Sequence, residues 1–304
     1  MRRSTSRWRE GWTAKRGAAL AGVLLTAGCS GILGIEADRY LVDAGPSGTA
    51  DSGGGGGTTD ASDGAAGADW SCLNTTAPPL GTGNVVLTLF FNDVSGAATS
   101  GSFAGTPIPG VSVRSCGTLD LDCKNPISSA VADDGGLAPI SVPIGFDGYY
   151  EVDAGTNYTP TILSRSPQRA DEQALQGMGS SALYALGAGL AGTTQDPNLS
   201  LAIVTAADCN SNPAPGVEFT VGAPGPNETV AYLENNLPSK SATATEATGS
   251  ALVFNVPAGT LTLSAAMSGT HQPIRSVTAL IRQGWVTFVQ IRPDQAQYTT
   301  TTNH

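Results

Sequence analysis

Histidine and aromatic residues are scarce in this sequence. The 304 residues include two histidines and 6% Phe, Trp and Tyr, and only 13% of the chain is charged. A Ser/His/Asp or Cys/His arrangement would have to use His271, because the other histidine is the terminal His304, and no nucleophile motif accompanies it. The histidines also supply too few ligands for a zinc site. We therefore predict no enzyme activity, assign no catalytic, cofactor-binding or metal-binding residue, and expect His271 at an exposed strand edge.

A long apolar run is also lacking. The stretch from Ala18 to Ala27 is shorter than the roughly 20 apolar residues that cross a bilayer. It follows a segment with six basic residues and one acid, which is typical of a secretory signal peptide. The stretch ends in LTAGC at positions 25–29, which resembles the lipobox of bacterial lipoproteins, with Thr26 where leucine is commonest. The alternative is an ordinary signal peptide with an incidental cysteine.

The lipobox resemblance implies that residues 1–28 are removed and that Cys29 carries acyl chains. Two or three buried chains hold a protein on a membrane essentially permanently. Ser30 is not the aspartate associated with inner-membrane retention, so we expect the outer membrane, on its periplasmic side or at the cell surface. Through the lipid anchor, the membrane would be one binding partner of the protein.

The chain that remains is strongly acidic. Without residues 1–28 it has nine basic and 24 acidic side chains, a net charge of −15. Such a surface repels phosphate backbones, so we predict no nucleic-acid partner. A protein or glycan ligand remains open.

Glycine, serine, alanine and aspartate dominate residues 43–69, which contain almost nothing that could bury apolar area. We predict a disordered linker there, after a lipidated stub at 29–42, and a disordered tail at 294–304. As a Gly/Ser-rich coil the linker would span about 30 Å.

The body of the sequence contains β patterns that occur twice. Val85–Phe91 is an apolar run of strand length. Alternating or β-branched segments follow it and flank glycine turns. The order then recurs: 201–204 corresponds to 85–91, 215–219 to 109–113, and 254–259 to 140–145. Three landmarks in one order indicate a duplication.

These strand starts and Val-Pro-x-Gly turns resemble carboxypeptidase regulatory-like domains, over roughly 84–163 and 199–293. The resemblance implies an all-β fold of two transthyretin-like (prealbumin-like) β-sandwich domains without catalytic residues of their own. We predict the domains at 70–165 and 199–293, with a helical connector at 166–198. Within the connector, apolar residues near helical spacing predict a helix from Asp171 to Leu190, packed where the sandwiches meet.

Four cysteines remain once Cys29 is lipidated, an even number in an oxidising compartment. They allow three connectivities. The short spacing between Cys116 and Cys123 favours that pair, which leaves Cys72 to pair with Cys209. The longer bond would lock the domains together.

Two acidic clusters, Asp120 with Asp122 and Asp133 with Asp134, are interpreted as turns, with calcium binding left open. Five aromatic residues, Trp70, Tyr149, Tyr150, Tyr158 and Trp285, are expected in cores or hairpins. The sequence thus favours a membrane-anchored, non-catalytic binding protein. A structural spacer of the cell envelope is the alternative, and a hydrolase with an unrecognised site is the third reading.

Overall fold

The computed structural model describes residues 67–77, 79–95 and 105–294. The predictions for the signal peptide, Cys29, the stub, the linker up to residue 66 and the tail from residue 295 fall outside these ranges. Among the residues described, no helix has the length and apolarity needed to span a bilayer.

The first sandwich contains strands β1 to β8. Their bounds are β1 Asn84–Asp93, β2 Thr106–Pro107, β3 Ser112–Cys116, β4 Ser128–Val131, β5 Leu137–Pro143, β6 Tyr149–Asp153, β7 Thr161–Ser164 and β8 Glu172–Met178. In one sheet β1 pairs antiparallel with β2 and β5 and parallel with β8, while the facing strands run in the order β4-β3-β6-β7. Alternate residues of β1, among them Leu87, Leu89 and Phe91, are fully buried in the core between the two layers.

The second sandwich contains strands β9 to β16. Their bounds are β9 Ser200–Ala206, β10 Val217–Gly222, β11 Thr229–Glu234, β12 Leu237–Ser239, β13 Ser250–Val256, β14 Gly259–Met267, β15 Pro273–Ile281 and β16 Val286–Ile291. One layer is β10-β14-β15 and the other is β12-β11-β13-β9-β16. Its core includes Val217, Val253 and Leu263, all fully buried. The all-β fold of two sandwiches is therefore confirmed.

The two sandwiches repeat the same strand pairings. In the first, β1 pairs antiparallel with β5 and parallel with β8, and in the second β9 pairs in the same senses with β13 and β16. The facing layers agree as well, since β3-β6-β7 matches β10-β14-β15 with antiparallel pairing throughout. The three landmarks of the sequence lie on β1 and β9, on or just before β3 and β10, and at the ends of β5 and β13. The duplication predicted from short motifs thus extends to the topology.

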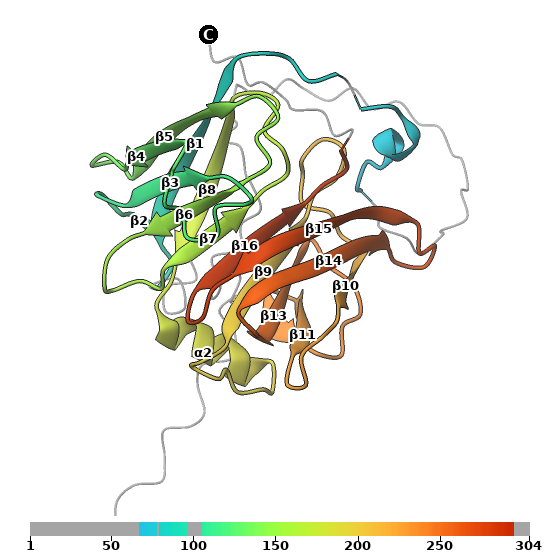
Figure 1. The fold of residues 1–304 in the computed structure, drawn as a ribbon. Coiled ribbons are helices and arrows are strands. Elements are labelled where there is room, and N and C mark those ends of the chain that lie inside the picture. Colours follow the sequence, from blue (N-terminus) through green and yellow to red (C-terminus); the bar gives the residue numbers. More distant parts are fainter. Residues whose placement is uncertain (1–66, 78, 96–104, 295–304) are drawn as a thin grey trace, which may run out of the picture.

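One continuous sheet joins the sandwiches. β16 pairs in parallel with β9 of its own sandwich on one side and with β7 of the first sandwich on the other, from Val286 opposite Thr161 to Val289 opposite Ser164. The result is a nine-stranded sheet that runs through both sandwiches, with β16 as its central strand and β7 next to it (Figure 1). Phe288 on β16 packs against the first core, so side chains as well as backbone cross this junction.

The helix expected from Asp171 to Leu190 is shorter than predicted. Residues Glu172–Met178 form β8, and only Ser181–Leu190 form helix α2. The prediction for the first half was wrong because β1 offers an open edge on which β8 makes seven parallel pairs, and tertiary pairing overrides local helix propensity. Ser180 is the N-cap of this helix, and its side chain accepts a hydrogen bond from the Leu183 amide.

The helix α2 packs on the second sandwich's part of the shared sheet. Leu183, Tyr184 and Ala188 are buried there with residues of β9, β11 and β13, and Val94 beyond the end of β1 joins the same cluster. Of the predicted apolar stripe, Leu186 and Leu190 stay half exposed.

A short segment before the first sandwich docks on the second one. The 3-10 helix η1 (Ser71–Asn74) contains Cys72, which is bonded to Cys209 with the two Cα atoms 5.8 Å apart. The Asp69 amide donates to the Asp208 carboxylate (3.0 Å), and the Cys209 amide donates to the Asp69 carbonyl (2.8 Å). The first described residues of the chain therefore lie against the second sandwich.

Candidate binding groove between the sandwiches

A groove with a volume of about 260 Å³ lies between the sandwiches. The first sandwich lines it with residues of β6, β7 and three connecting segments, and the second lines it with β14, β15 and β16. The lining residues are Thr118, Leu121, Asp147, Gly148, Tyr149, Ser164, Arg165, Thr260, Arg275, Ser276, Val277, Thr278, Ala279, Leu280 and Gln290. Pockets that enclose drug-sized ligands are typically about 300 to 1,000 Å³, so this is a small site.

The disulfide loop between Cys116 and Cys123 forms one wall of the groove. The Asp120 carboxylate accepts hydrogen bonds from the amides of Lys124 (3.0 Å) and Asn125 (2.7 Å), and these two bonds lower its pKa, that of Asn125 most. Tyr149 donates its hydroxyl hydrogen to the Asp120 carbonyl (2.5 Å). The covalent bond and these contacts hold the loop in place against β6.

Arg282 ties this wall to the second sandwich. It follows β15, and its guanidinium donates to the Leu121 carbonyl (2.5 Å) and lies 4.9 Å from the centre of the Trp285 ring. It also forms an ion pair with Glu151 on β6, which Arg114 of β3 contacts as well. Glu151 is 4% exposed, so a buried carboxylate with two arginines bridges the domain boundary.

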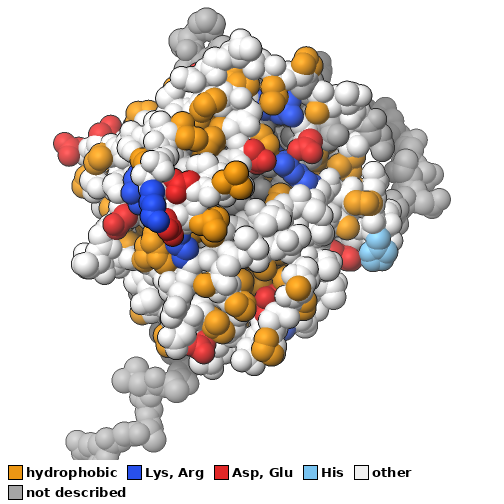
Figure 2. Space-filling model, viewed as in Figure 1, with side chains coloured by type: hydrophobic (Ala, Val, Ile, Leu, Met, Phe, Trp, Pro, Cys, Tyr) orange, Lys and Arg blue, Asp and Glu red, His pale blue; other side chains and the backbone are white. Residues whose placement is uncertain are grey.

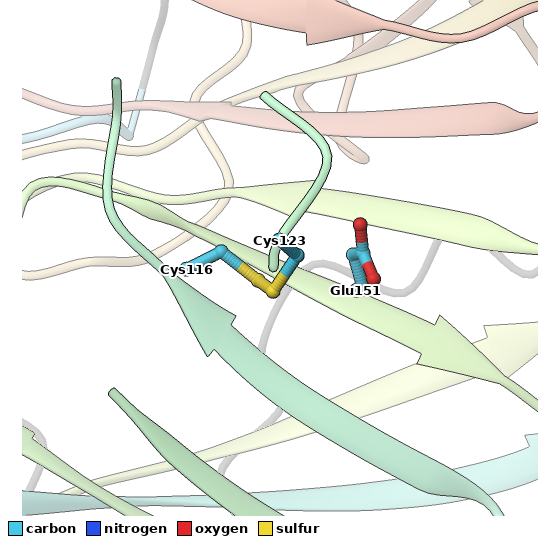
Figure 3. A group of neighbouring side chains, drawn as sticks. All are labelled: Cys116, Cys123 and Glu151. Atoms are coloured by element: carbon cyan, nitrogen blue, oxygen red, sulfur yellow. A yellow bond between two sulfur atoms is a disulfide. The ribbon is translucent and has the colours of Figure 1, made fainter. Parts of the chain in front are cut away.

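Glu151 also lies beside the disulfide, as Figure 3 shows. Among the described residues, Cys116, Cys123 and Glu151 are the group of three ligand-type side chains close enough to share an ion, within 4.8 Å of one another. Their sulfur atoms are bonded to each other and the carboxylate is paired with arginines, whereas a metal needs free thiolates. This geometry suits a structural brace.

A second buried ion cluster includes Arg165, which also lines the groove. Glu172 at the start of β8 accepts from Arg165 (2.6 Å) and from Arg292 beyond β16 (3.3 Å). Burial by itself raises the pKa of Glu172, but the charges and hydrogen bonds of the two arginines outweigh it, so the pKa is lowered. Arg275 on β15 adds another cross-sandwich contact, to Ser166 (3.3 Å), and pairs with Asp294 (2.8 Å).

Both predicted disulfides are present, Cys72 with Cys209 and Cys116 with Cys123.

His271 lies in the turn between β14 and β15, 74% exposed, with Nδ1 3.2 Å from Glu218. In the other acidic cluster, the Asp133 carboxylate accepts from the amides of Gly135 and Leu137, as expected of a turn.

The five aromatic residues lie in or against the cores. Tyr150 is buried in the first core and Tyr158 packs on it, while Trp70 packs on the second. Tyr149 and Trp285 share a small cluster beside the disulfide, where Tyr149 also lines the groove. Sequence reasoning missed the arginines and glutamates at the boundary. The pairs that cross it join residues 120 and 131 positions apart along the chain, Arg292 with Glu172 and Arg282 with Glu151.

No family model matches the chain, and no curated protein matches it either. Solved structures with some likeness include the Bacillus anthracis TIE protein, at 15% identity over 69% of this chain and 34% of that chain, with a TM-score of 0.24. Others are a double mutant of the shaft pilin SpaA from Lactobacillus rhamnosus GG (13% identity, 70% and 98% covered, TM-score 0.23) and the minor pilin GBS52 from Streptococcus agalactiae (14%, 72% and 100%, 0.22). The match thus spans about a third of the TIE chain.

Likenesses at such low TM-scores say nothing about function, which is therefore inferred from the groove and the residues around it. Figure 2 shows charged side chains as small groups of both signs on a surface that is otherwise largely uncharged in this view.

Proposed function

We propose that this protein is a non-catalytic lipoprotein of the outer membrane. Cys29 carries the lipid, the linker lifts the body from the bilayer, and the two sandwiches present their groove to a protein or glycan partner. The carboxypeptidase regulatory-like resemblance supports a binding role, since such domains have no catalytic residues of their own.

The observation that carries this proposal is the composite groove. Two buried ion clusters, Glu151 with Arg114 and Arg282, and Glu172 with Arg165 and Arg292, fix its two sides relative to each other. A fixed site costs less entropy when a ligand binds than a site between mobile domains does. A spacer needs no such site, so the groove favours binding over the spacer alternative.

Anchoring is tested by Cys29→Ser. We expect this variant to lose labelling by a palmitate analogue and to leave the membrane fraction, whereas Ser30→Ala should stay labelled and membrane-bound. Ser30→Asp should keep the label but shift the protein to the inner membrane. A labelled, membrane-bound Cys29→Ser protein would refute the lipid anchor.

Binding is tested by photo-crosslinking in cells. A photoreactive residue at Thr118, on the groove, should give a discrete crosslinked product, and one at Thr220, on the far strand β10, should not. Equal products at both positions, or none at either, would favour the spacer.

A further inference from the structure

The groove runs along the free edge of β15. Six consecutive residues of this strand, Arg275–Leu280, line it. A strand that presents a face to a cavity contributes alternate residues, because successive side chains point to opposite sides. Consecutive lining residues show that the edge, with its main-chain amides and carbonyls, borders the space. Within the described ranges, β15 pairs with β14 alone.

In the first sandwich, the strand edge that corresponds to the free edge of β15 is paired with another strand. β7 follows β6 there as β15 follows β14 in the second sandwich, and β16 pairs in parallel with β7 over four residue pairs. The corresponding position beside β15 holds no strand of the described residues, and the groove lies there. The duplicated fold thus contains one filled and one open copy of the same strand-accepting edge.

The open edge is regular where the groove is. Natural edges are often blunted by proline or a bulge. In β15, Pro273 and the register shift opposite Ala265 and Ala266 lie at the start of the strand. The pairing with β14 from Ser276 to Ile281 is continuous. The Leu280 carbonyl already accepts a hydrogen bond from the Thr287 side chain of β16 (3.0 Å), so the open part of the edge is the regular stretch from Ser276 to Ala279.

We propose that the groove binds an extended peptide strand of a partner protein, which pairs through its main chain with the edge of β15 in the parallel sense that β16 uses on β7. This assignment rests on the proposed binding function and narrows it to a protein partner. In this mode of recognition, main-chain hydrogen bonds supply affinity and the neighbouring side chains select the sequence.

The test uses the full protein purified from membranes and a phage-displayed library of random heptapeptides as the probe. The strongest binder is synthesised unmodified and with every second amide N-methylated, in both frames. We expect at least one methylated frame to lose binding more than tenfold, since one edge of the peptide then lacks its donors. A twofold or smaller change between 50 and 500 mM salt would accord with main-chain recognition.

Two matched variants locate the site. Thr278 and Thr220 are both exposed threonines on the outer face of the same three-stranded sheet, paired with β14 from opposite sides, but only Thr278 lines the groove. Thr278→Arg should weaken peptide binding at least tenfold, and Thr220→Arg should stay within twofold. Hydrogen exchange should show new protection at amides between Arg275 and Leu280 in the complex.

Three results would overturn the proposal: no peptide is selected, both variants lose affinity equally, or protection appears on β10 or β4 instead of β15. Selection of envelope glycans but not peptides, blocked by Thr278→Arg, would show that the groove holds a carbohydrate. None of these four results would bear on the lipid anchor, which the Cys29→Ser experiment tests independently.

Discussion

Arg292 reaches across the domain boundary to Glu172, with 3.3 Å between Nη2 and Oε2. Arg292 is 1% exposed and follows the last strand of the second sandwich, whereas Glu172 opens the last strand of the first. The corresponding strands of the two repeats, β8 and β16, are therefore linked at one buried point. Removing one partner of such a cluster leaves the other charges buried without a compensating charge.

Glu172→Gln should therefore lower the free energy of unfolding by about 3 to 5 kcal/mol, the usual cost of breaking a buried ion pair from one side. Urea denaturation measures this. Glu234→Gln, at the exposed end of β11, is the matched control and should change stability by less than about 0.5 kcal/mol. Equal losses of unfolding free energy for the two substitutions would show that the buried cluster stabilises the fold no more than an exposed glutamate does.

Stability should also fall at acidic pH in a way that depends on Glu172. Its pKa is lower in the folded protein than the ordinary value of 4.5. A carboxyl group with a lowered pKa contributes stability above its unfolded pKa and loses it as the pH falls toward the folded pKa. The difference between wild type and Glu172→Gln should thus be constant from pH 7 to about 5.5 and shrink below about 4.5, by at most about 1.4 kcal/mol per pH unit. A difference that grows on acidification would contradict the lowered pKa.

The two disulfides should differ in what they stabilise. In the loop-entropy model, the bond from Cys72 to Cys209, with 137 positions between its ends, contributes about 5 kcal/mol, and the bond across seven positions contributes about 2.5 kcal/mol. Replacing each pair with alanines and measuring urea denaturation tests this order. A larger loss of unfolding free energy on replacing Cys116 and Cys123 would contradict the loop-entropy order. It would mean that the groove wall depends on its disulfide more than the model predicts.

Unfolding should remain a single transition when both disulfides are removed. β16 pairs with strands of both sandwiches, so neither sheet can open without breaking the other. Calorimetry of the four-alanine protein should therefore give one peak at a lower temperature. Two separate peaks would mean that the sandwiches unfold independently despite the shared sheet.

Two glycines with positive φ provide a local test of backbone packing. Gly249 has a φ of 65°, and a Cβ there would lie 2.5 Å from the Ala206 carbonyl oxygen. Gly269 has a φ of 80° but no atom within 4 Å of the same position. Gly269→Ala should cost about 1 kcal/mol from backbone strain alone, and Gly249→Ala clearly more, about 3 kcal/mol or above, because the clash adds to the strain. Thermal denaturation of both variants decides between strain and crowding.

Local patterns in the sequence were sufficient for several features. The strand-length apolar run Val85–Phe91 predicted β1, and its counterpart at 201–204 predicted β9, since a buried strand needs β-branched and aromatic residues whatever its neighbours are. The repeated turn motifs predicted the duplication, and the spacing of Cys116 and Cys123 predicted their bond and hence the second one. Each of these signals lies within a few residues of the chain or in a comparison of the chain with itself.

Contacts between distant segments were decided only by the tertiary structure. Glu172–Met178 has residues suited to a helix, yet it becomes a strand because β1 offers it an edge. The pairing of β16 with β7 depends on how one sandwich docks on the other, and no short motif encodes that. The groove and the buried Glu151 and Glu172 clusters follow from this docking, because their walls and ion partners come from both repeats.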